Sequence, residues 1–392
     1  MRHRNNLFLI YMICVCVSSC KHQVDDALNS ICVDLESVDS LYDASVLFHP
    51  DSKHKLLHLE ANEDCIIGEI SNVFINSGEI IIIDNLTKNI YKFDINGNYK
   101  ARIGAYGRAS NEYMDLTDVF VTDNTIYVLD NISQKILVYD IDGIFEYNID
   151  ISSLWGHHLI VSEDIAYLIN KWSDSSIGRY RLFSIDKQGH ILSKQLSFKN
   201  KDTERYYSDE VSCAASDERV VICYPSDNTI YTIDQNMHCL PYLNVDFMKN
   251  TMPEKYITLD ILEARKMGIT NKYIWGIDSI RLSSRYLFLS YMFRKSKYNV
   301  IYDLKTGDYF SIKALHTKDF YGLPIGRYYV SDNYLISYME PSSFIFTYDN
   351  LLKTRMDPNN MYHKEVMSIA NNVNTDANGI LILYQLKDWN NE

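Results

Sequence analysis

Aromatic and charged side chains gather in five segments of this chain, and their types could support ligand recognition. The segments hold Arg108, Glu112 and Tyr113; Trp155, His157 and His158; Arg205, Tyr206 and Tyr207; Tyr273 and Trp275; and His316, Phe320 and Tyr321. Aromatic rings stack on sugars or on peptide side chains, and nearby guanidinium and carboxylate groups direct hydrogen bonds. The candidate ligand-binding residues are Arg108, Glu112, Tyr113, Trp155, His157, Arg205, Tyr207, Trp275 and Tyr321. Because the chain has 31 Tyr residues, packing of loop aromatics is the alternative interpretation.

Signals for a metal, a cofactor or catalysis are weak. His157 and His158 are adjacent, so on a strand they would point to opposite faces and could not share one ion. The sequence contains no G-x-S-x-G, H-E-x-x-H, phosphate-binding loop or paired Cys-x-x-Cys motif. We therefore expect no metal site and no cofactor.

The elements that must position these segments form a repeat. "FDINGNY" (93–99) and "YDIDGIF" (139–145) are similar turns between strand-like runs. The turn aspartates are spaced by 46, 46, 48, 69 and 46 residues, and they are Asp94, Asp140, Asp186, Asp234, Asp303 and, more weakly, Asp349. Asp and Asn bond to their own backbone and Gly accepts a positive φ, so each turn is predicted to be a hairpin corner.

Each repeat carries four short strands, which is typical of one β-propeller blade. In the second repeat they read "TDVFVTD", "NTIYVLD", "KILVYDI" and "IFEYNID". The predicted fold is an all-β, six-bladed β-propeller with four antiparallel strands in each blade. Its blades are expected at 70–104, 116–151, 158–197, 210–246 and 277–313, with a sixth from about residue 326.

The sixth blade is predicted to be composite. Its third strand would be 379–387 and its fourth the N-terminal run 55–61, which closes the ring and removes open sheet edges. The propeller domain would then span residues 55–392. A helix from Thr251 to Gly268, with Glu254 completing a capping box, is expected between the fourth and fifth blades. A second amphipathic helix is expected before the last strand, where Val366, Ile369, Ala370 and Val373 form a stripe that packs on the propeller.

The N-terminus is predicted to be a bacterial lipoprotein signal over residues 1–19. Arg2 and Arg4 precede an apolar run, 7–17, that is too short to cross a bilayer, and Ser18 and Ser19 precede Cys20. Lipidation of Cys20 would anchor residues 20–54 and the mature domain to a membrane face. Ordinary secretion with incidental cysteines is the alternative.

Charge argues against nucleic acid as a partner. The net charge is −13, and removal of residues 1–19 takes away two arginines and makes it −15. A strongly negative chain without a basic patch would repel a phosphate backbone. Five cysteines remain after Cys20, an odd number, so no full disulfide framework is expected. Cys213 and Cys223 are either bonded across a hairpin or two small buried apolar residues.

These features together resemble the six-bladed β-propeller lipoproteins of the Bacteroidota, with NHL-like or TolB-like repeats. The resemblance lies in the Cys20 region, "HLEA" (58–61), "IYKFDINGNYKARIGAYGRASNEY" (90–113) and "GILILYQLK" (379–387). The family's G-R-G-P-G-E-Y/F loop reads "GRASNEY" here, which keeps Arg108, Glu112 and Tyr113 but lacks the proline and two glycines. The resemblance implies a lipid-anchored envelope propeller, often associated with nutrient uptake.

In a propeller, the connections between blades and those between second and third strands meet on one face, where function concentrates. The five segments above lie in connections between blades. We therefore predict an outer-membrane lipoprotein that binds an oligosaccharide or peptide on that face, or docks there on a partner of an uptake complex. A propeller lyase or hydrolase is the alternative, and three or more convergent His, Asp or Glu side chains at the axial mouth would favour it. A scaffold that contacts only protein is a third hypothesis.

Overall fold

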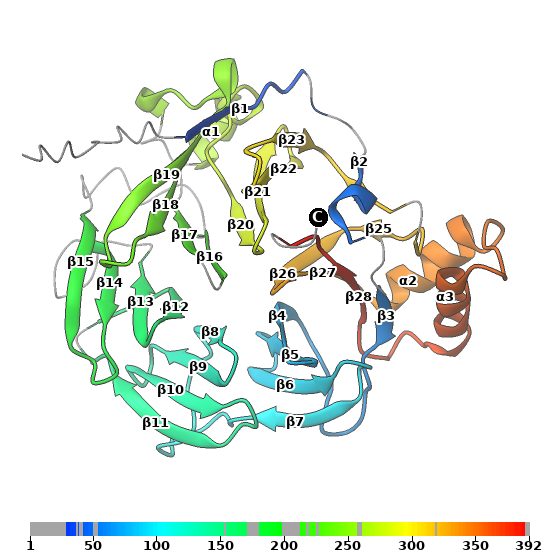
Figure 1. Ribbon diagram of the computed structural model, residues 1–392, viewed down its shortest axis with the longest axis horizontal. Helices are drawn as coiled ribbons and strands as arrows, with labels where there is room; N and C mark the ends of the chain where they lie inside the picture. Colours follow the sequence, from blue (N-terminus) through cyan, green and yellow to red (C-terminus); the bar gives the residue numbers. More distant parts are fainter. Residues whose placement is uncertain are drawn as a thin grey trace, which may run out of the picture.

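The protein is described by a computed structural model. It describes residues 29–36, 38, 42–49, 54–152, 154–170, 180–197, 212–216, 219–224, 227–256, 261–317 and 320–388. Six small antiparallel sheets stand in a ring around a common axis (Figure 1). This arrangement confirms the predicted six-bladed propeller.

Each of the first five blades is continuous in sequence and runs outward from the axis. The first blade comprises β4 (Ile70–Asn76), β5 (Glu79–Asp84), β6 (Asn89–Asp94) and β7 (Tyr99–Ile103). The second comprises β8 (Asp118–Val121), β9 (Thr125–Asp130), β10 (Lys135–Asp140) and β11 (Phe145–Asp150). The third comprises β12 (His158–Ser162), β13 (Ile165–Ile169), β14 (Tyr180–Ile185) and β15 (Ile191–Ser197). The fourth comprises β16 (Ser212–Ser216), β17 (Arg219–Cys223), β18 (Thr229–Ile233) and β19 (Cys239–Asp246). The fifth comprises β20 (Ser279–Leu282), β21 (Tyr286–Phe293), β22 (Ser296–Asp303) and β23 (Tyr309–Ile312).

The predicted corners join the third and fourth strands of these blades. Asp94 accepts the backbone N–H groups of Asn96 and Asn98 at 2.8 and 3.0 Å. Asp140, Asp186 and Asp234 accept the equivalent pair of bonds, and Asp303 accepts two from a slightly longer turn. The carboxylates therefore fix the turn backbone, as the chemistry of Asp in turns predicts.

The sixth blade combines strands from the N-terminal and C-terminal parts of the chain. Its strands are β26 (Arg327–Ser331), β27 (Tyr334–Met339), β28 (Ile380–Gln385) and β3 (Lys55–His58), and β3 pairs antiparallel with β28. The expected corner at Asp349 is wrong, because Asp349 lies in a π-helical turn, Tyr348–Leu352. The third and fourth strands of this blade come from distant parts of the chain, so no hairpin turn joins them.

The helix between the fourth and fifth blades is shorter than predicted. Among the described residues of this insertion, only α1 (Ile261–Lys266) is α-helical, and Thr251 does not cap it. Thr251 instead follows a 3-10 turn, Met248–Asn250, and its hydroxyl donates to Asp246 at 3.1 Å. Gly268 follows α1 with a positive φ of 67°, the conformation expected at a helix end.

Two helices lie between β27 and β28, beside the sixth blade. α2 (Pro341–Thr347) is not predicted, whereas α3 (Met361–Asn372) confirms the second predicted helix. Val366 is fully buried, and Ile369, Ala370 and Val373 pack against the same core, so the predicted stripe faces the propeller. No helix in the described ranges is long and apolar enough to cross a membrane.

The segment before the propeller is partly folded onto it. β1 (Asn29–Cys32) adds a fifth strand, parallel to β19, to the fourth blade. β2 (Tyr42–Asp43) pairs with β24 (Leu315–His316), which pairs with β25 (Pro324–Ile325) in the connection between the last two blades. Leu47 and Phe48 then enter the core of the sixth blade. These contacts are not predicted by the sequence patterns.

The described cysteines, Cys32, Cys65, Cys213, Cys223 and Cys239, are all free. In the β16–β17 hairpin, Ser212 lies opposite Cys223 and Cys213 opposite Ile222. Cys213 and Cys223 therefore point to opposite faces of the blade and enter different apolar clusters. Of the two interpretations of this pair, the structure supports two small apolar residues.

Candidate functional site

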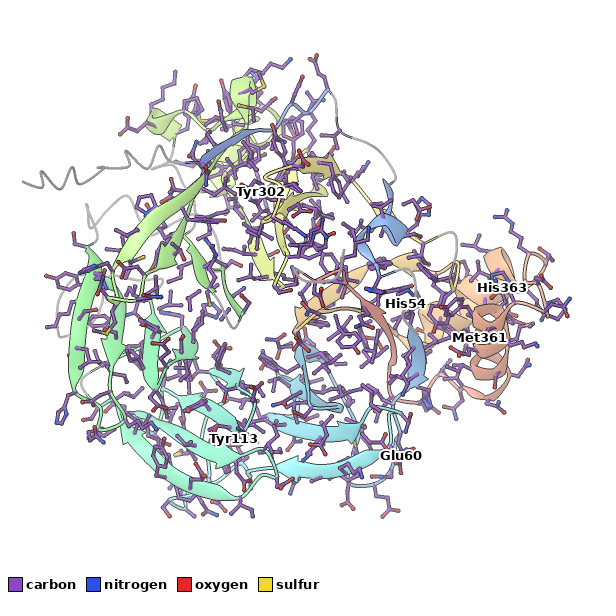
Figure 2. The ribbon with its side chains drawn as sticks, in the orientation of Figure 1. His54, Glu60, Tyr113, Tyr302, Met361 and His363 are labelled. Atoms are coloured by element: carbon purple, nitrogen blue, oxygen red, sulfur yellow. The ribbon has the colours of Figure 1, made fainter. Side chains whose placement is uncertain are left out.

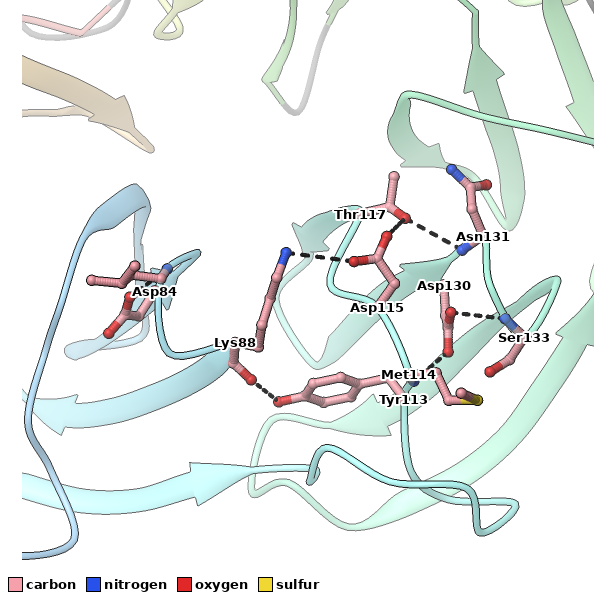
Figure 3. A network of polar contacts seen from close by, with 10 residues as sticks. Asp84, Lys88, Tyr113, Met114, Asp115, Thr117, Asp130, Asn131 and Ser133 are labelled. Carbon is pink, nitrogen blue, oxygen red and sulfur yellow. Dashed lines mark hydrogen bonds and ion pairs between the residues drawn. The ribbon is translucent and has the colours of Figure 1, made fainter.

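The loop face is the side of the ring that carries the connections between blades and those between second and third strands. Two buried aspartates hold its loop backbone by hydrogen bonds, and each lies at the end of the second strand of its blade (Figure 3). Asp84 accepts backbone N–H groups of Gly68, Glu69, Leu86 and Thr87 at 2.6–3.2 Å. Asp130 accepts those of Met114 and Ser133 at 2.7 and 2.9 Å. Charge-assisted bonds of this kind hold the loop backbone in one conformation.

The Gly107–Tyr113 loop between the first two blades is closed by its own side chains. Glu112 folds back and accepts the N–H of Ala109 at 2.9 Å. Its carboxylate lies against Gly107, where a Cβ atom would come within 1.9 Å of it. Tyr113 is fully buried and donates its hydroxyl to the carbonyl of Lys88 at 3.0 Å, and burial raises the pKa of that hydroxyl. Arg108 is exposed on the loop, whereas Tyr113 belongs to the packing below it.

The next connection presents Trp155 to solvent from a fixed backbone. The neighbouring Gly156 is held on both sides by Asn131, whose amide donates to its carbonyl at 2.6 Å and accepts its N–H at 3.3 Å. Trp155 itself is exposed. His157 is half-buried, and its backbone N–H pairs with Ile169.

The remaining predicted site residues are dispersed. Trp275 is half-buried in the insertion after the fourth blade, against a small cluster that includes Met252 and Ile269. Tyr321 is fully buried between the last two blades and donates its hydroxyl to Glu365 at 2.9 Å. Burial, with the nearby Glu365 charge, raises the pKa of Tyr321. Arg205, Tyr207 and Cys20 lie outside the described residues.

Large apolar side chains stand exposed along the loop face of the first three blades. We call this set the apolar arc; its members are 45–69% exposed and are Ile66, Leu86, Tyr106, Ile132 and Trp155. Leu86 and Ile132 occupy equivalent positions after Asp84 and Asp130 in the first two repeats. The aligned repeats "DNL" and "DNI" carried this signal, but alignment alone does not show that the apolar residue faces solvent.

Among the described residues, an aspartate and a histidine of neighbouring innermost strands are in contact. Oδ2 of Asp118 in β8 lies 3.4 Å from Nδ1 of His158 in β12, and it also accepts the backbone N–H of Leu159 at 2.9 Å. Both residues begin the innermost strands of their blades, at the loop face. Within the part of the chain that the structure describes, no group of three His, Cys, Asp or Glu residues is arranged to hold a metal.

A pocket of about 270 Å³ opens between the fifth and sixth blades. We call it the cationic pocket, because Arg281, Lys297, Lys313 and Arg327 line it, together with Asn299, Ala314, Leu315, Ile325, Gly326 and Tyr328. Arg327 begins β26 and Lys297 lies near the start of β22, so both stand at the loop-face ends of their strands. None of these residues is among the predicted site residues. They come from separate elements and form no motif in the sequence.

The walls of this pocket are held by polar contacts from the fifth blade. The Arg281 guanidinium lies 5.0 Å from the ring centre of Tyr328 and donates to Ser279 at 3.1 Å. The Tyr328 hydroxyl donates to Asn299 at 3.2 Å. Below this layer the same face of the blade becomes apolar, with Phe288 and Ile301 in the core. The pocket is therefore the polar, loop-face end of the layer between the two blades.

Three solved structures are similar to this chain to different degrees, and the first of them supports the fold. A protein from Bacteroides fragilis NCTC 9343, named as exported, is 18% identical with a TM-score of 0.71, over 92% of this chain and 100% of that chain. A member of the DUF4221 family from Bacteroides vulgatus ATCC 8482 is 14% identical with a TM-score of 0.47, over 85% and 96%. Virginiamycin B lyase from Staphylococcus aureus is 12% identical with a TM-score of 0.41, over 73% and 82%.

Sequence comparison identifies the family without an activity. The comparison with curated proteins gives no match. Residues 51–385 match the family described as "Domain of unknown function (DUF4934)", and the chain therefore belongs to that family.

Proposed function

We propose that this protein is a propeller of the cell envelope, anchored to the outer membrane by a lipid on Cys20, that binds an oligosaccharide on its loop face. The signal-like sequence of residues 1–19 and the likeness to a protein named as exported support the location. A place in an uptake complex fits the same location.

The apolar arc is the observation that carries the binding proposal. Binding of a ligand to exposed apolar groups costs little conformational entropy when the loops that carry them are already held in one conformation. Two residues of the apolar arc, Leu86 and Ile132, lie in turns between polar neighbours. The neighbours are Asn85 and Thr87 for Leu86, and Asn131 and Ser133 for Ile132. A sugar chain presents C–H faces and hydroxyl groups side by side, so stacking and hydrogen bonding can occur together. Arg108 lies in the same part of the face.

Binding to glycan and peptide arrays tests this proposal. We expect wild-type protein to bind a set of glycans, and Trp155→Ala, Arg108→Ala and Ile132→Ala to weaken that binding about tenfold. Ile144→Ala is the matched control, because Ile144 is 66% exposed in the same blade as Ile132 (59%) but in a turn on the opposite face. Binding to peptides alone, or unchanged glycan binding in both Trp155→Ala and Arg108→Ala, would contradict the proposal. Cys20→Ser should release the protein from the membrane fraction, with Cys16→Ser as its control.

A further inference from the structure

We propose that the cationic pocket is an anion subsite that takes one acidic sugar residue, bearing a carboxylate or a sulfate ester, of the ligand on the loop face. The part of this inference that identifies the ligand as a sugar rests on the proposed function, whereas the positive charge of the pocket does not depend on it. Residues of β20, β22, β24, β25 and β26 line the pocket, with Lys313 and Ala314 after β23. Figure 1 shows the fifth and sixth blades, which carry β20, β22 and β26, as neighbours in the ring.

Among the residues that the structure describes, no counter-charge is in direct contact with the pocket cations. None of Arg281, Lys297, Lys313 and Arg327 has a carboxylate oxygen within 4.0 Å among the residues that the structure describes. This is unusual in a chain with net charge −13, where acidic residues outnumber basic ones by 51 to 38. Like charges held together raise the free energy of the empty site, and a bound anion would lower it.

The electrostatics at Lys297 agree with this geometry. Its side chain is exposed at the pocket mouth, yet the surrounding walls partly desolvate the amine. This desolvation, then the nearby Arg281, and also Arg327, lower the pKa of Lys297, and the Asp278 charge only partly offsets them. Asp278 is itself desolvated, which raises its pKa to about 6. An anion placed among these cations would stabilise the protonated lysine.

The pocket is also arranged before any ligand arrives. Ser279 and the Tyr328 ring fix Arg281, and Asn299 fixes the Tyr328 hydroxyl. A guanidinium held in this way can form paired hydrogen bonds with a carboxylate or sulfate without losing further side-chain freedom. Lys297, Lys313 and Arg327 are exposed around the opening and can reach a bound group.

Size and lining favour a sugar acid over a bare inorganic ion. The volume of about 270 Å³ is slightly below that of typical small-molecule pockets, which begin near ~300 Å³, and suits one sugar residue of a longer ligand. Leu315 and Ile325 contribute apolar wall to a lining that also carries four positively charged side chains. A ring with a C–H face and one acidic substituent fits both parts of the lining.

The test compares charged and uncharged forms of the same sugars. Wild-type protein is titrated by calorimetry with uronate trisaccharides and their methyl esters, with sulfated disaccharides and their desulfated forms, and with inorganic sulfate. We expect at least one acidic sugar to bind more tightly than its uncharged form and than sulfate. Lys297→Gln and Lys313→Gln should each weaken that binding about tenfold, and added salt should weaken it in wild type. Lys272→Gln is the matched control, an exposed lysine on the same face outside the pocket.

The outcomes separate this inference from the proposed function. If the lysine variants bind every sugar like wild type while Trp155→Ala weakens binding, the anion subsite is contradicted and glycan binding at the apolar arc is supported. Loss of acidic-sugar binding in the lysine variants with no effect of Trp155→Ala supports the pocket and contradicts the apolar arc. Sulfate binding as tight as that of every acidic sugar, or no binding by any acidic sugar, overturns the inference. Arg281→Gln is a further variant, read only if its circular dichroism matches wild type.

Discussion

His54 lies in an aromatic enclosure between the sixth blade and the helices beside it (Figure 2). The ring centres of Phe320, Phe48 and Tyr384 lie 4.1, 5.6 and 5.6 Å from that of the imidazole. Its Nδ1 accepts the backbone N–H of Gln385 at 3.3 Å, and a nitrogen that accepts this bond cannot carry a proton. Burial lowers the pKa of His54 to about 4.

Acid should therefore destabilise the fold through His54. The folded state holds the imidazole neutral while the unfolded chain protonates it near ~pH 6.5, so stability is complete above that pH and falls as the pH drops toward 4. Between pH 7.5 and 4.5 the expected loss from this residue is about 2–3 kcal/mol. Urea unfolding of wild type and His54→Phe at both pH values measures it. The variant should lose less stability on acidification, and an equal loss in both would show that His54 does not titrate as described.

Burial decides which of the sequence-based site residues can contact a ligand directly. Tyr113 and Trp155 looked equivalent in the sequence, yet Tyr113 packs under its loop while Trp155 is exposed. A loop aromatic can point either way, and its direction depends on which neighbouring carbonyls and carboxylates fasten the backbone. The cationic pocket escaped prediction for a related reason. Arg281 and Arg327 are distant in the sequence and line one pocket only because two blades pack together.

Among the secondary-structure elements, the turns made the fold predictable. An Asp that bonds two following N–H groups needs only local sequence, so five corners could be located without tertiary information. Asp349 failed because the third and fourth strands of the sixth blade come from distant parts of the chain, so no hairpin turn joins them, and Asp349 lies in a π-helical turn. The helix expected at Thr251 failed because Thr251 forms a β-bridge with Ile274 of the same insertion, and its hydroxyl bonds to Asp246 instead of capping a helix.

The corners also give a matched pair of glycines. Gly143 and Gly189 hold the same position, with φ of 86° and 83°. A Cβ at Gly143 would meet Ile103 at an ordinary 3.6 Å, whereas one at Gly189 would lie 2.2 Å from the carbonyl oxygen of Asp150. Gly143→Ala should therefore cost about 1–2 kcal/mol from backbone strain alone, and Gly189→Ala should cost more. Denaturant unfolding measures both, and equal losses would contradict the close approach at Gly189.

Across the ring as a whole, the N-terminal segment holds several blades together. β1 extends the fourth blade, β2 supports the connection that lines the cationic pocket, and β3 closes the sixth blade. Cys32 marks one of these contacts, since its backbone bonds the hydroxyl of Tyr309 in the fifth blade. A membrane anchor at Cys20 would therefore be linked to the blades through folded chain and not only through a tether.

Closure of the ring should depend on β3 much more than on β1. A chain that begins at residue 34 loses β1, its core residues Ile31 and Val33, and the bonds between Cys32 and Tyr309, but it keeps the four strands of every blade and should keep cooperative unfolding. A chain that begins at residue 59 also loses Leu47, Phe48, Leu56 and Leu57 from the core and leaves β28 as an open edge. Loss of a buried leucine alone costs about 2–5 kcal/mol, and an open apolar edge promotes association. Thermal unfolding and size-exclusion chromatography of the two chains compare them. A monomeric, cooperatively folded chain from residue 59 would show that the first five blades and the remainder of the sixth are stable without closure.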